Sequence, residues 1–374
     1  MDFELTEDQL ELRDNARSVL AGACPPSLVR AVHEGRSTAD DLWATLVGLG
    51  WPALGVDEAH GGLGLGFLEV GVVVEELGRV VAPTAFLATA TQLVPMLRES
   101  PATDWLAAVA TGSCTGTLAV AEAGRWEPEA VAATARRTDD GWGLHGTKTH
   151  VLDGATADQI AVVARLAGTG GSDGLGAFVV PRSALSVQAT AVIDPTLPVA
   201  TVVLDDVEVD QSGVLIEPGD PDAPRRIGRA LEEATTAMAL STVATCRSIF
   251  ETTLQYAKDR EQFGRPIGSF QALKHRLADV YLAVERASAL AYFAALTIAE
   301  DDDRRAMATS MAKAAAGDCQ RLVAGDGLQL HGGVGFTWEN DLHLWLKRAK
   351  TGDLLFGTAA THRAHLARLL GLAA

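Results

Sequence analysis

The sequence predicts an α+β protein in which helical segments precede and follow a run of β-strands. Residues 1–114 carry apolar positions at helical spacing. Residues 115–222 are rich in Val and Thr, with Gly, Asp or Pro between short apolar runs, and residues 223–374 return to long helical patterns. Because strands and helices are segregated, we expect an N-terminal helical domain, a middle β domain and a C-terminal four-helix domain, not an alternating parallel sheet.

The N-terminal helical domain is expected to open with a capping box, since Thr6 is followed three residues later by Gln9. Residues 60–66, HGGLGLG, resemble a phosphate loop, but Phe67 occupies the last position of G-x-G-x-x-G and no clear strand precedes it. We therefore interpret this segment as a loop between helices. Further helical patterns cover residues 38–50, 70–79 and 85–98.

Short β-branched runs predict the strands of the middle domain, and long amphipathic runs predict the helices that follow. Strands are expected over residues 116–122, 141–153, 159–166, 176–182, 185–193 and 200–209. Helices are expected over residues 226–258, 272–299, 304–325 and 340–371.

Composition excludes several classes of function. The 374 residues include 48% hydrophobic residues and carry a net charge of −17, so a nucleic-acid partner is not expected. The N-terminus lacks the pattern of a signal peptide, and no uncharged apolar stretch reaches the length of a membrane span, so we expect a cytoplasmic protein. No metal motif is present. Four isolated cysteines predict free thiols: Cys24, Cys114, Cys246 and Cys319.

Two segments point to a nucleotide cofactor. DREQFGRPIGSFQ, residues 259–271, interrupts two long helices, and QLHGGVGF, residues 329–336, ends a helix in glycines. Both place Arg, Gln or glycine backbone at helix ends, which suits a phosphate. We interpret His331, within the second segment, as a packing residue and not as a metal ligand.

The chain resembles the acyl-CoA dehydrogenase family along nearly its whole length. The resemblance rests on YAKDREQFGRPIGSFQALKHRLADV (256–280), GTKTHVLDGATADQIAVVAR (146–165) and LQLHGGVGFTWENDLHLWLKRAK (328–350). It implies an acyl-CoA dehydrogenase-like fold and oxidation of an acyl-CoA to the trans-2-enoyl-CoA. A glutamate would remove the α proton while the β hydrogen leaves as hydride to FAD.

The resemblance also implies which residues hold the cofactor. The arginine motif and the QxxGGxG motif of that family bind the ADP end of an FAD that belongs to an adjacent subunit. The corresponding cofactor-binding candidates are Arg260, Gln262, Phe263, Phe270, Gln271, Gln329, Gly332, Gly333 and Thr358.

Motifs that would serve the flavin ring and the base depart from the family pattern. The T-E-x-x-(A/G)-G-S-D stretch is reduced to Glu122 with Ala121 before it, and W-I-T-N-G becomes H-V-L-D-G, with His150 and Leu152 in place of the Trp and Thr. Phe356 stands at the usual position of the catalytic glutamate, and it cannot accept a proton.

Some family members place the base on the first long helix of the C-terminal domain. Spacing from the arginine motif leads to Ala234, beside Glu232 and Glu233, which are the candidate catalytic residues here. A solvated helix face near an N-terminus is the simpler interpretation of these two carboxylates.

Three hypotheses remain open. The chain is the incomplete subunit of an α2β2 heterotetramer, as in some actinobacterial members of the family, or a homotetrameric enzyme that uses Glu233 or Glu232. The third hypothesis is a non-catalytic scaffold that binds CoA esters or flavin. An electron-transfer flavoprotein or similar protein is the expected electron acceptor. Candidate partners for the CoA phosphates are Arg225, Arg226 and Arg229.

Overall fold

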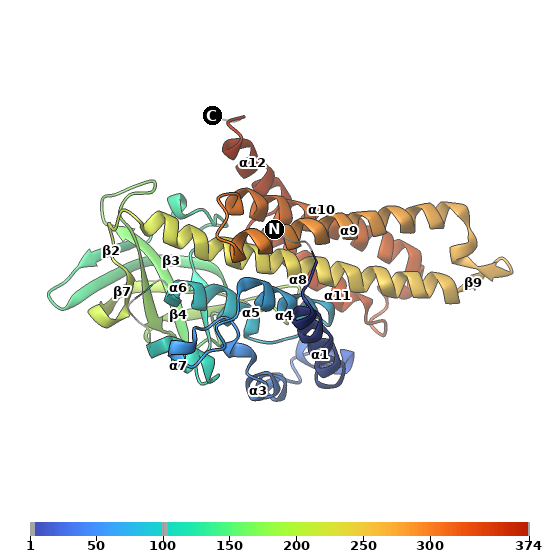
Figure 1. Cartoon of the computed structure of the whole chain (residues 1–374), viewed down its shortest axis with the longest axis horizontal. Helices are drawn as coiled ribbons and strands as arrows, with labels where there is room; N and C mark the ends of the chain where they lie inside the picture. The colour runs from blue at the N-terminus through green and yellow to red at the C-terminus, as the bar shows by residue number, and fades with distance from the viewer. Residues whose placement is uncertain (1–3, 99, 101–103, 373–374) are drawn as a thin grey trace. The chain divides into compact units, whose positions relative to one another are not determined.

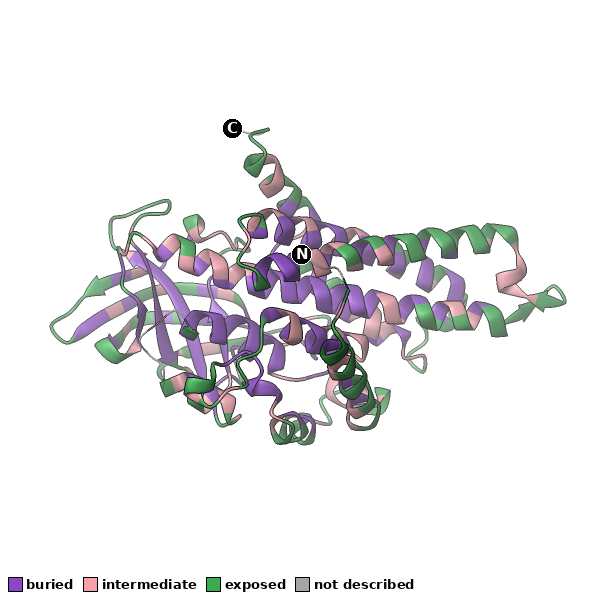
Figure 2. Cartoon of the chain, in the orientation of Figure 1, coloured by how far each residue is buried: buried purple, intermediate pink, exposed green. Residues whose placement is uncertain are grey.

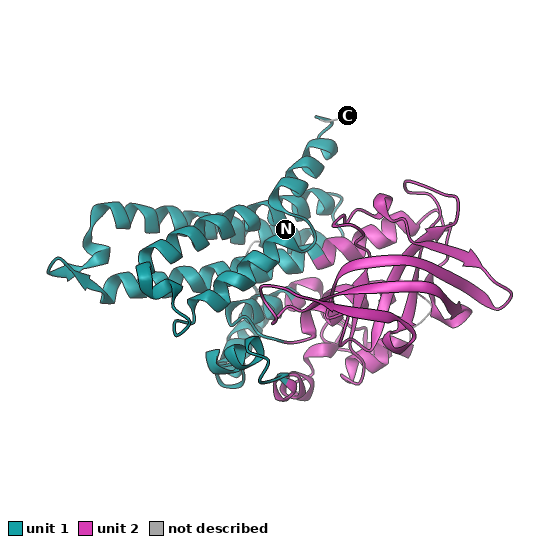
Figure 3. Cartoon of the chain, turned by 180° about the vertical axis from the view of Figure 1, so that it is seen from behind, with its two compact units in different colours: residues 1–39, 71–83, 235–374 teal, residues 40–70, 84–234 magenta. Residues whose placement is uncertain are grey.

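The computed structural model describes residues 4–98, 100 and 104–372, and it confirms the α+β class (Figure 1). The chain forms two compact units (Figure 3). Unit 1 contains residues 1–39, 71–83 and 235–374, and unit 2 contains residues 40–70 and 84–234. This division follows packing, whereas the predicted domains follow element type, so it does not test the predicted boundaries.

Unit 2 is built on a mixed β-sheet with strand order β6-β7-β3-β2-β4-β5-β8, in which β1 also pairs with β4. The strands are β1 Gly116–Ala119, β2 Thr134–Arg137, β3 Gly141–Leu152, β4 Gln159–Leu166, β5 Leu175–Pro181, β6 Ser186–Thr190, β7 Val199–Asp210 and β8 Val214–Ile216. All six predicted strands are present. The sequence analysis missed β2 and β8, because β2 reads TARR with exposed arginines and β8 has only three residues.

The central strands of this sheet are buried on both faces. In β4, every residue from Gln159 to Arg165 is buried, which is why its sequence is a continuous apolar run without alternation. Trp142 and Phe178 meet edge to face, with their ring centroids 6.0 Å apart, inside the same core. Figure 2 shows the continuous burial of these strands.

The remaining helices of unit 2 lie within the predicted helical segments 38–50 and 85–98, except the one over residues 104–110, which the sequence analysis missed. They are α3 Asp40–Gly48, α5 Phe86–Ala88, α6 Val94–Arg98 and α7 Asp104–Ala110, with a π-helical turn at Thr89–Leu93. Residues 61–66 form the predicted loop before α4, Phe67–Arg79. A Cβ on Gly62 would lie 1.9 Å from the carbonyl oxygen of Val56, so this glycine permits close backbone packing.

Unit 1 consists mainly of long helices. They are α1 Glu7–Ala23, α2 Pro26–His33, α9 Gln271–Ala299, α10 Arg305–His331, α11 Leu342–Leu354 and α12 Ala359–Leu369. The helix α8, Ala223–Asp259, contributes residues 223–234 to unit 2 and its remainder to unit 1. The capping box is confirmed, since Thr6 accepts from the Gln9 amide and Gln9 accepts from the Thr6 amide.

Two helix boundaries differ from the prediction. The helix expected over 304–325 continues to His331, because Gly325 and Gly327 do not interrupt the hydrogen bonds of α10. The single helix expected over 340–371 is divided into α11 and α12, because Phe356 and Gly357 have φ of +59° and +95°. Such values lie outside the right-handed helical region.

Of the helices in the described residues, α9 is long and apolar enough, by length and composition, to cross a membrane. Half of its most apolar window is buried inside the protein. A helix in a protein core gives the same signal, so this observation assigns nothing by itself.

Small residues let helices of unit 1 approach closely. A Cβ on Gly78 of α4 would lie 2.6 Å from the carbonyl oxygen of Ser241 on α8, and a Cβ on Gly352 of α11 would lie 2.1 Å from Oγ1 of Thr242. Backbone stands on one side of the first contact, so a larger residue at position 78 must separate the helices.

We predict that Gly78→Ala lowers the free energy of unfolding by about 1–3 kcal/mol, because the added methyl overpacks the contact with Ser241. The matched control is Gly22→Ala in α1, where a Cβ meets no atom within 4 Å, and it should be neutral or stabilise by up to about 1 kcal/mol. Urea unfolding of both variants checks this. Equal stability of the two would contradict the close contact.

Candidate functional site

The break between α8 and α9 is a short β-hairpin with a two-residue turn. The sequence analysis did not predict this hairpin. Strands β9, Glu261–Gln262, and β10, Arg265–Pro266, pair antiparallel. The turn residues Phe263 and Gly264 have φ of +55° and +77°, as a type I′ turn requires. The hairpin lies at the end of unit 1 where α8 stops and α9 begins (Figure 1).

The hairpin displays its functional groups to solvent. The side chain of Phe263 is 92% exposed, although a left-handed conformation costs a non-glycine residue about 1–2 kcal/mol. Its ring meets Phe270 edge to face at 6.1 Å, and the guanidinium of Arg265 lies 4.2 Å from the centroid of Phe270. Arg260, Gln262 and Gln271 are exposed beside these rings. An aromatic ring held in solvent at a conformational cost is typical of a contact surface.

The second segment follows the end of α10. Gly332 has φ +57°, and a Cβ on Gly332 or Gly333 would meet no atom within 4 Å. Gln329 is exposed. The backbone at these two glycines is therefore open to close approach by a bound group.

An aromatic stack joins the two segments. His331, which precedes Gly332, lies parallel to Tyr256 near the end of α8, with ring centroids 4.4 Å apart. Its Nδ1 also hydrogen-bonds the carbonyl oxygen of Gly327 at 2.9 Å. His331 is thus a buried packing residue, as the sequence analysis predicts. Its stack on Tyr256 holds together the two helix ends from which the hairpin and the glycine segment begin.

The turn between α11 and α12 carries Phe356 and Thr358. The side chain of Phe356 is buried, and no carboxylate stands at this position. Thr358 caps α12 by accepting from the Thr361 amide at 3.3 Å. A pocket of about 400 Å³ opens beside Thr358, and its lining includes Arg321, Lys350 and Arg363. All three cations are paired within this chain, Arg321 and Arg363 with Asp318 and Lys350 with Asp353, so an anion here would have to compete with these carboxylates.

In unit 2, Glu122 has a structural role. It pairs with Lys148 at 2.6 Å and accepts from the amides of Ala132 and Ala133 at 2.8 and 3.0 Å. Lys148 is fully buried, and its burial lowers its pKa to about 8 against the opposing effect of Glu122. This pair ties strand β3 to the segment after β1 and leaves the Glu122 carboxylate committed to these three polar contacts.

The side chains at positions 121 and 152, where the family pattern has hydroxyls, offer none. Ala121 and Leu152 are buried apolar residues. His150 is exposed at φ +55°, and its ring lies 6.3 Å from that of Trp126. These residues do not fit the hydrogen bonds that a flavin ring would need here.

Glu233 is not the solvated residue that the simpler interpretation expects. It lies in the third turn of α8, is only 7% exposed, and pairs with Arg98 of α6 at 3.3 Å. Arg98 also donates to the carbonyl oxygen of Gly55 at 3.3 Å. That expectation fails because α8 begins at Ala223 and this face of its third turn packs inside unit 2. Glu232 is half-buried.

Comparison with known proteins identifies the fold and the family. Residues 6–113 match the acyl-CoA dehydrogenase N-terminal domain, and residues 225–371 match the acyl-CoA dehydrogenase C-terminal domain. The acyl-CoA dehydrogenase IpdE2 of Mycobacterium tuberculosis is 30% identical over 346 residues, which cover 92% of this chain and 91% of that protein. This chain belongs to the acyl-CoA dehydrogenase family.

Two solved structures are similar over nearly their full lengths. One is the ChsE4–ChsE5 complex from Mycobacterium tuberculosis, with a TM-score of 0.89, 27% identity and full coverage of both chains. The other is a variant of the Tcur3481–Tcur3483 steroid acyl-CoA dehydrogenase, with a TM-score of 0.86, 30% identity and 98% coverage of both chains.

Acyl-CoA dehydrogenases are FAD-dependent flavoproteins. In this member of the family, the exposed hairpin and the open glycines fit the ADP end of FAD, through Arg260, Gln262, Gly332 and Gly333. When bound, FAD would accept the electrons released by oxidation of the acyl-CoA thioester. The residues at the ring end do not fit, because the side chains of Ala121 and Leu152 offer no hydrogen bond and Phe356 cannot take a proton.

The arginines that the sequence analysis assigns to CoA phosphates are partly engaged within this acyl-CoA dehydrogenase chain. Arg225 pairs with Asp222, and Arg226 pairs with Asp220 at 3.2 Å and donates to the carbonyl oxygen of Leu215. A phosphate would have to compete with these carboxylates, so the structure gives Arg225 and Arg226 a local role at the start of α8.

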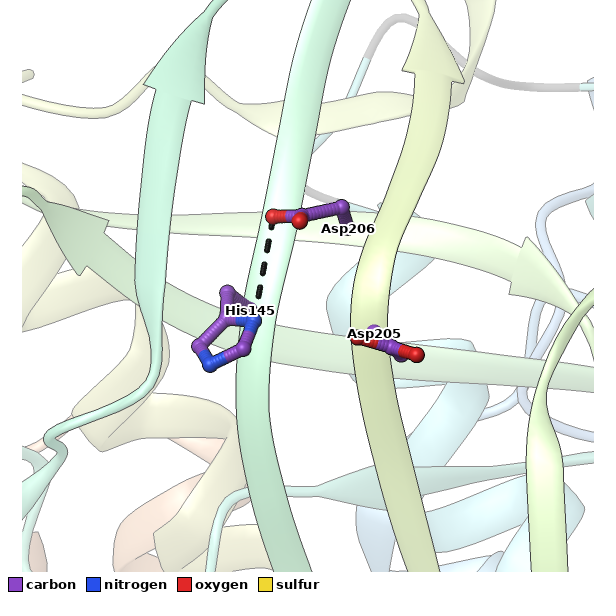
Figure 4. Close-up of side chains that lie close together, drawn as sticks. All are labelled: His145, Asp205 and Asp206. Atoms are coloured by element: carbon purple, nitrogen blue, oxygen red, sulfur yellow. Dashed lines mark ion pairs between the residues drawn. The ribbon is translucent and has the colours of Figure 1, made fainter.

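The structure also brings together a group that sequence motifs could not reveal. His145 of β3 faces Asp205 and Asp206 of β7, and their potential ligand atoms lie within 4.8 Å of one another (Figure 4). A β-bulge causes this, because two residues of β7 oppose one of β3 and Asp206 has φ +50°. All three are exposed, and the contact of 3.7 Å between His145 and Asp206 accounts for the arrangement, so we assign no metal to it.

We predict that Lys313 of α10 makes unfolding pH-dependent. Burial lowers its pKa from 10.5 to about 7, so between these values the unfolded chain binds more protons than the folded chain. This lysine therefore makes stability rise with pH across that window. From pH 7 to pH 9.5, urea unfolding should show wild type gaining about 1–3 kcal/mol relative to Lys313→Met. The control is Lys274→Met, an exposed site on α9; the same pH dependence in both variants would contradict the prediction.

Proposed function

We propose that this chain is one of two different subunits of an acyl-CoA dehydrogenase. It supplies the residues that hold the ADP end of an FAD whose ring and catalytic base belong to the partner subunit. The observation that carries this proposal is an asymmetry within the chain. The exposed Arg260–Gln271 segment is preserved, whereas a buried phenylalanine occupies the position of the base.

The exposure of the hairpin supports a neighbouring subunit. Phe263 adopts a costly backbone conformation and projects its ring into solvent, and Arg265 covers Phe270 beside it. A cofactor at this surface would gain a guanidinium for its phosphates and an aromatic face for its adenine. Within this chain the Phe263 ring meets Phe270 at its edge, yet 92% of the residue is exposed, so most of the ring is open to another molecule.

The related structures support two kinds of subunit and suggest the substrate class. The ChsE4–ChsE5 structure is a complex of two named proteins. The Tcur3481–Tcur3483 structure is likewise named for two proteins, and it is a steroid acyl-CoA dehydrogenase. We infer that the partner oxidises a bulky acyl-CoA to the trans-2-enoyl-CoA. Its electrons would pass to an electron-transfer flavoprotein or similar acceptor, in the cytoplasm.

A self-sufficient enzyme is the second candidate, and the burial of Glu233 is the observation that favours it. A buried carboxylate beside Ala234 is the kind of group a proton abstraction needs. However, Arg98 already pairs with this carboxylate and anchors itself on Gly55, which gives Glu233 a structural role within unit 2.

We predict that this chain purified alone retains almost no FAD, and that co-expression with a second acyl-CoA dehydrogenase subunit gives a yellow complex with fewer FAD molecules than chains. In that complex, Arg260→Ala should raise the Kd of FAD about tenfold or more, because it removes a charge-assisted contact. The control is Arg136→Ala on β2, an exposed arginine outside the hairpin. One FAD per chain in the lone protein would refute the proposal.

We predict that Glu233→Gln lowers the free energy of unfolding by about 1–3 kcal/mol, because it weakens the charge-assisted contact of a buried carboxylate with the exposed Arg98. The rate of flavin reduction by acyl-CoA in the complex should stay within about threefold of wild type. Stopped-flow absorbance measures that rate, and Arg98→Met is the control that breaks the same pair from its other side. A loss of about a thousandfold in Glu233→Gln alone would instead identify the base.

A further inference from the structure

The turn between α11 and α12 is held by buried side-chain donors. Three of its backbone carbonyls, those of Asp353, Phe356 and Gly357, accept hydrogen bonds from Lys313 or His362, and we call these bonds the turn clamp. All five residues belong to unit 1. Neither the hairpin nor the open glycines of the cofactor segments takes part in this arrangement.

Lys313 reaches the turn from α10. Its side chain is fully buried, and Nζ donates to the carbonyl oxygen of Asp353 at 3.0 Å and to that of Gly357 at 2.7 Å. One amine therefore links the last turn of α11 to the residue just before Thr358. A buried lysine is costly, so two well-placed acceptors give it a specific role at this point.

His362 reaches the same turn from the first turns of α12. Its Nε2 lies 2.9 Å from the carbonyl oxygen of Phe356. A carbonyl can only accept, so Nε2 carries the proton, and Nδ1 faces Oγ of Ser310 at 3.4 Å. Burial lowers the pKa of His362 to about 4, which keeps this single tautomer neutral at pH 7.

The turn needs such support because its backbone is strained. Phe356 has φ +59°, a conformation that a bulky residue rarely adopts, and Gly357 follows at φ +95°. A Cβ on Gly357 would lie 3.3 Å from Nε2 of His362, so the imidazole packs directly against the turn. Without the donors, relaxation of Phe356 would redirect its side chain and move the Thr358 cap.

We propose that Lys313 and His362 are positioning residues, whose donated hydrogen bonds fix the direction of the side chain at 356 and the place of the Thr358 hydroxyl. The importance of these two places for an FAD-dependent dehydrogenase rests on the proposed function. The turn clamp itself is a property of this chain. It keeps the turn in shape although Phe356 has replaced the acid that the turn would present in a complete enzyme.

Amide hydrogen exchange tests the turn clamp on the purified chain, without cofactor or partner. Informative amides are those of Leu355, Thr361 and His362, which donate to Thr351, Thr358 Oγ1 and Thr358 respectively. Lys313→Met and His362→Phe remove a donor and keep the volume similar. They should speed exchange at these amides about tenfold or more. Lys313→Gln and His362→Gln restore a donor and should stay within about threefold of wild type.

Two further results separate positioning from simple packing. In wild type, protection of the turn should fall as pH falls from about 9.5 to 7, because Lys313 takes up a proton more readily when the turn opens than in its buried site, and Lys313→Met should lack this dependence. Exchange in the hairpin at 261–266 should not change in any variant. Equal exchange in the Met and Gln variants, or no change in Lys313→Met and His362→Phe, would overturn the proposal. Neither outcome depends on flavin binding. The Arg260→Ala experiment therefore tests the proposed function independently of the turn clamp.

Discussion

The stacking of Tyr256 on His331 is the contact on which the cofactor-facing end of unit 1 depends. It joins the ends of α8 and α10 at 4.4 Å, and each helix is followed at once by one of the two cofactor segments. Because both rings are anchored on helices, the hairpin and the open glycines are held as one surface. That surface is built before any ligand arrives, so binding would cost little ordering of the backbone.

The hairpin and the α11–α12 turn both contain a strained phenylalanine, but the first is exposed and the second is buried. Around the hairpin, backbone strain at Phe263 is combined with exposure, which leaves donors and rings ready for another molecule. Around the α11–α12 turn, strain at Phe356 is combined with burial and with donors from Lys313 and His362. Strain is thus maintained at both places, with exposed donors and rings at the hairpin and a buried phenylalanine at the turn. This contrast is what a subunit that assists a partner's cofactor would retain.

Local sequence predicted much of the fold because its signals are short in range. The Thr6 capping box, six of the strands and the positions of the long helices follow from spacing and composition, and the structure confirms them apart from the end of α10 and the division of residues 340–371. Predictions failed where packing overrides local signals. The strand β2 is polar but pairs between β3 and β4, and α10 continues through Gly325 and Gly327 to His331. Glu233 was expected in solvent, because no residue near it in the sequence indicates that Arg98 lies beside it.

The sequence by itself determined the α+β layout and the family, and it predicts residues for the ADP end of the cofactor, because the signals for all three sit in contiguous segments. It also determined that Phe356 cannot act as a base. Only the tertiary structure decided that Glu122 and Glu233 are held in ion pairs, and that Lys313 and His362 converge on one turn. The same holds for the bulge that gathers His145 with two aspartates. These contacts join residues far apart along the chain, and only the packing of strands and helices sets the distances between them.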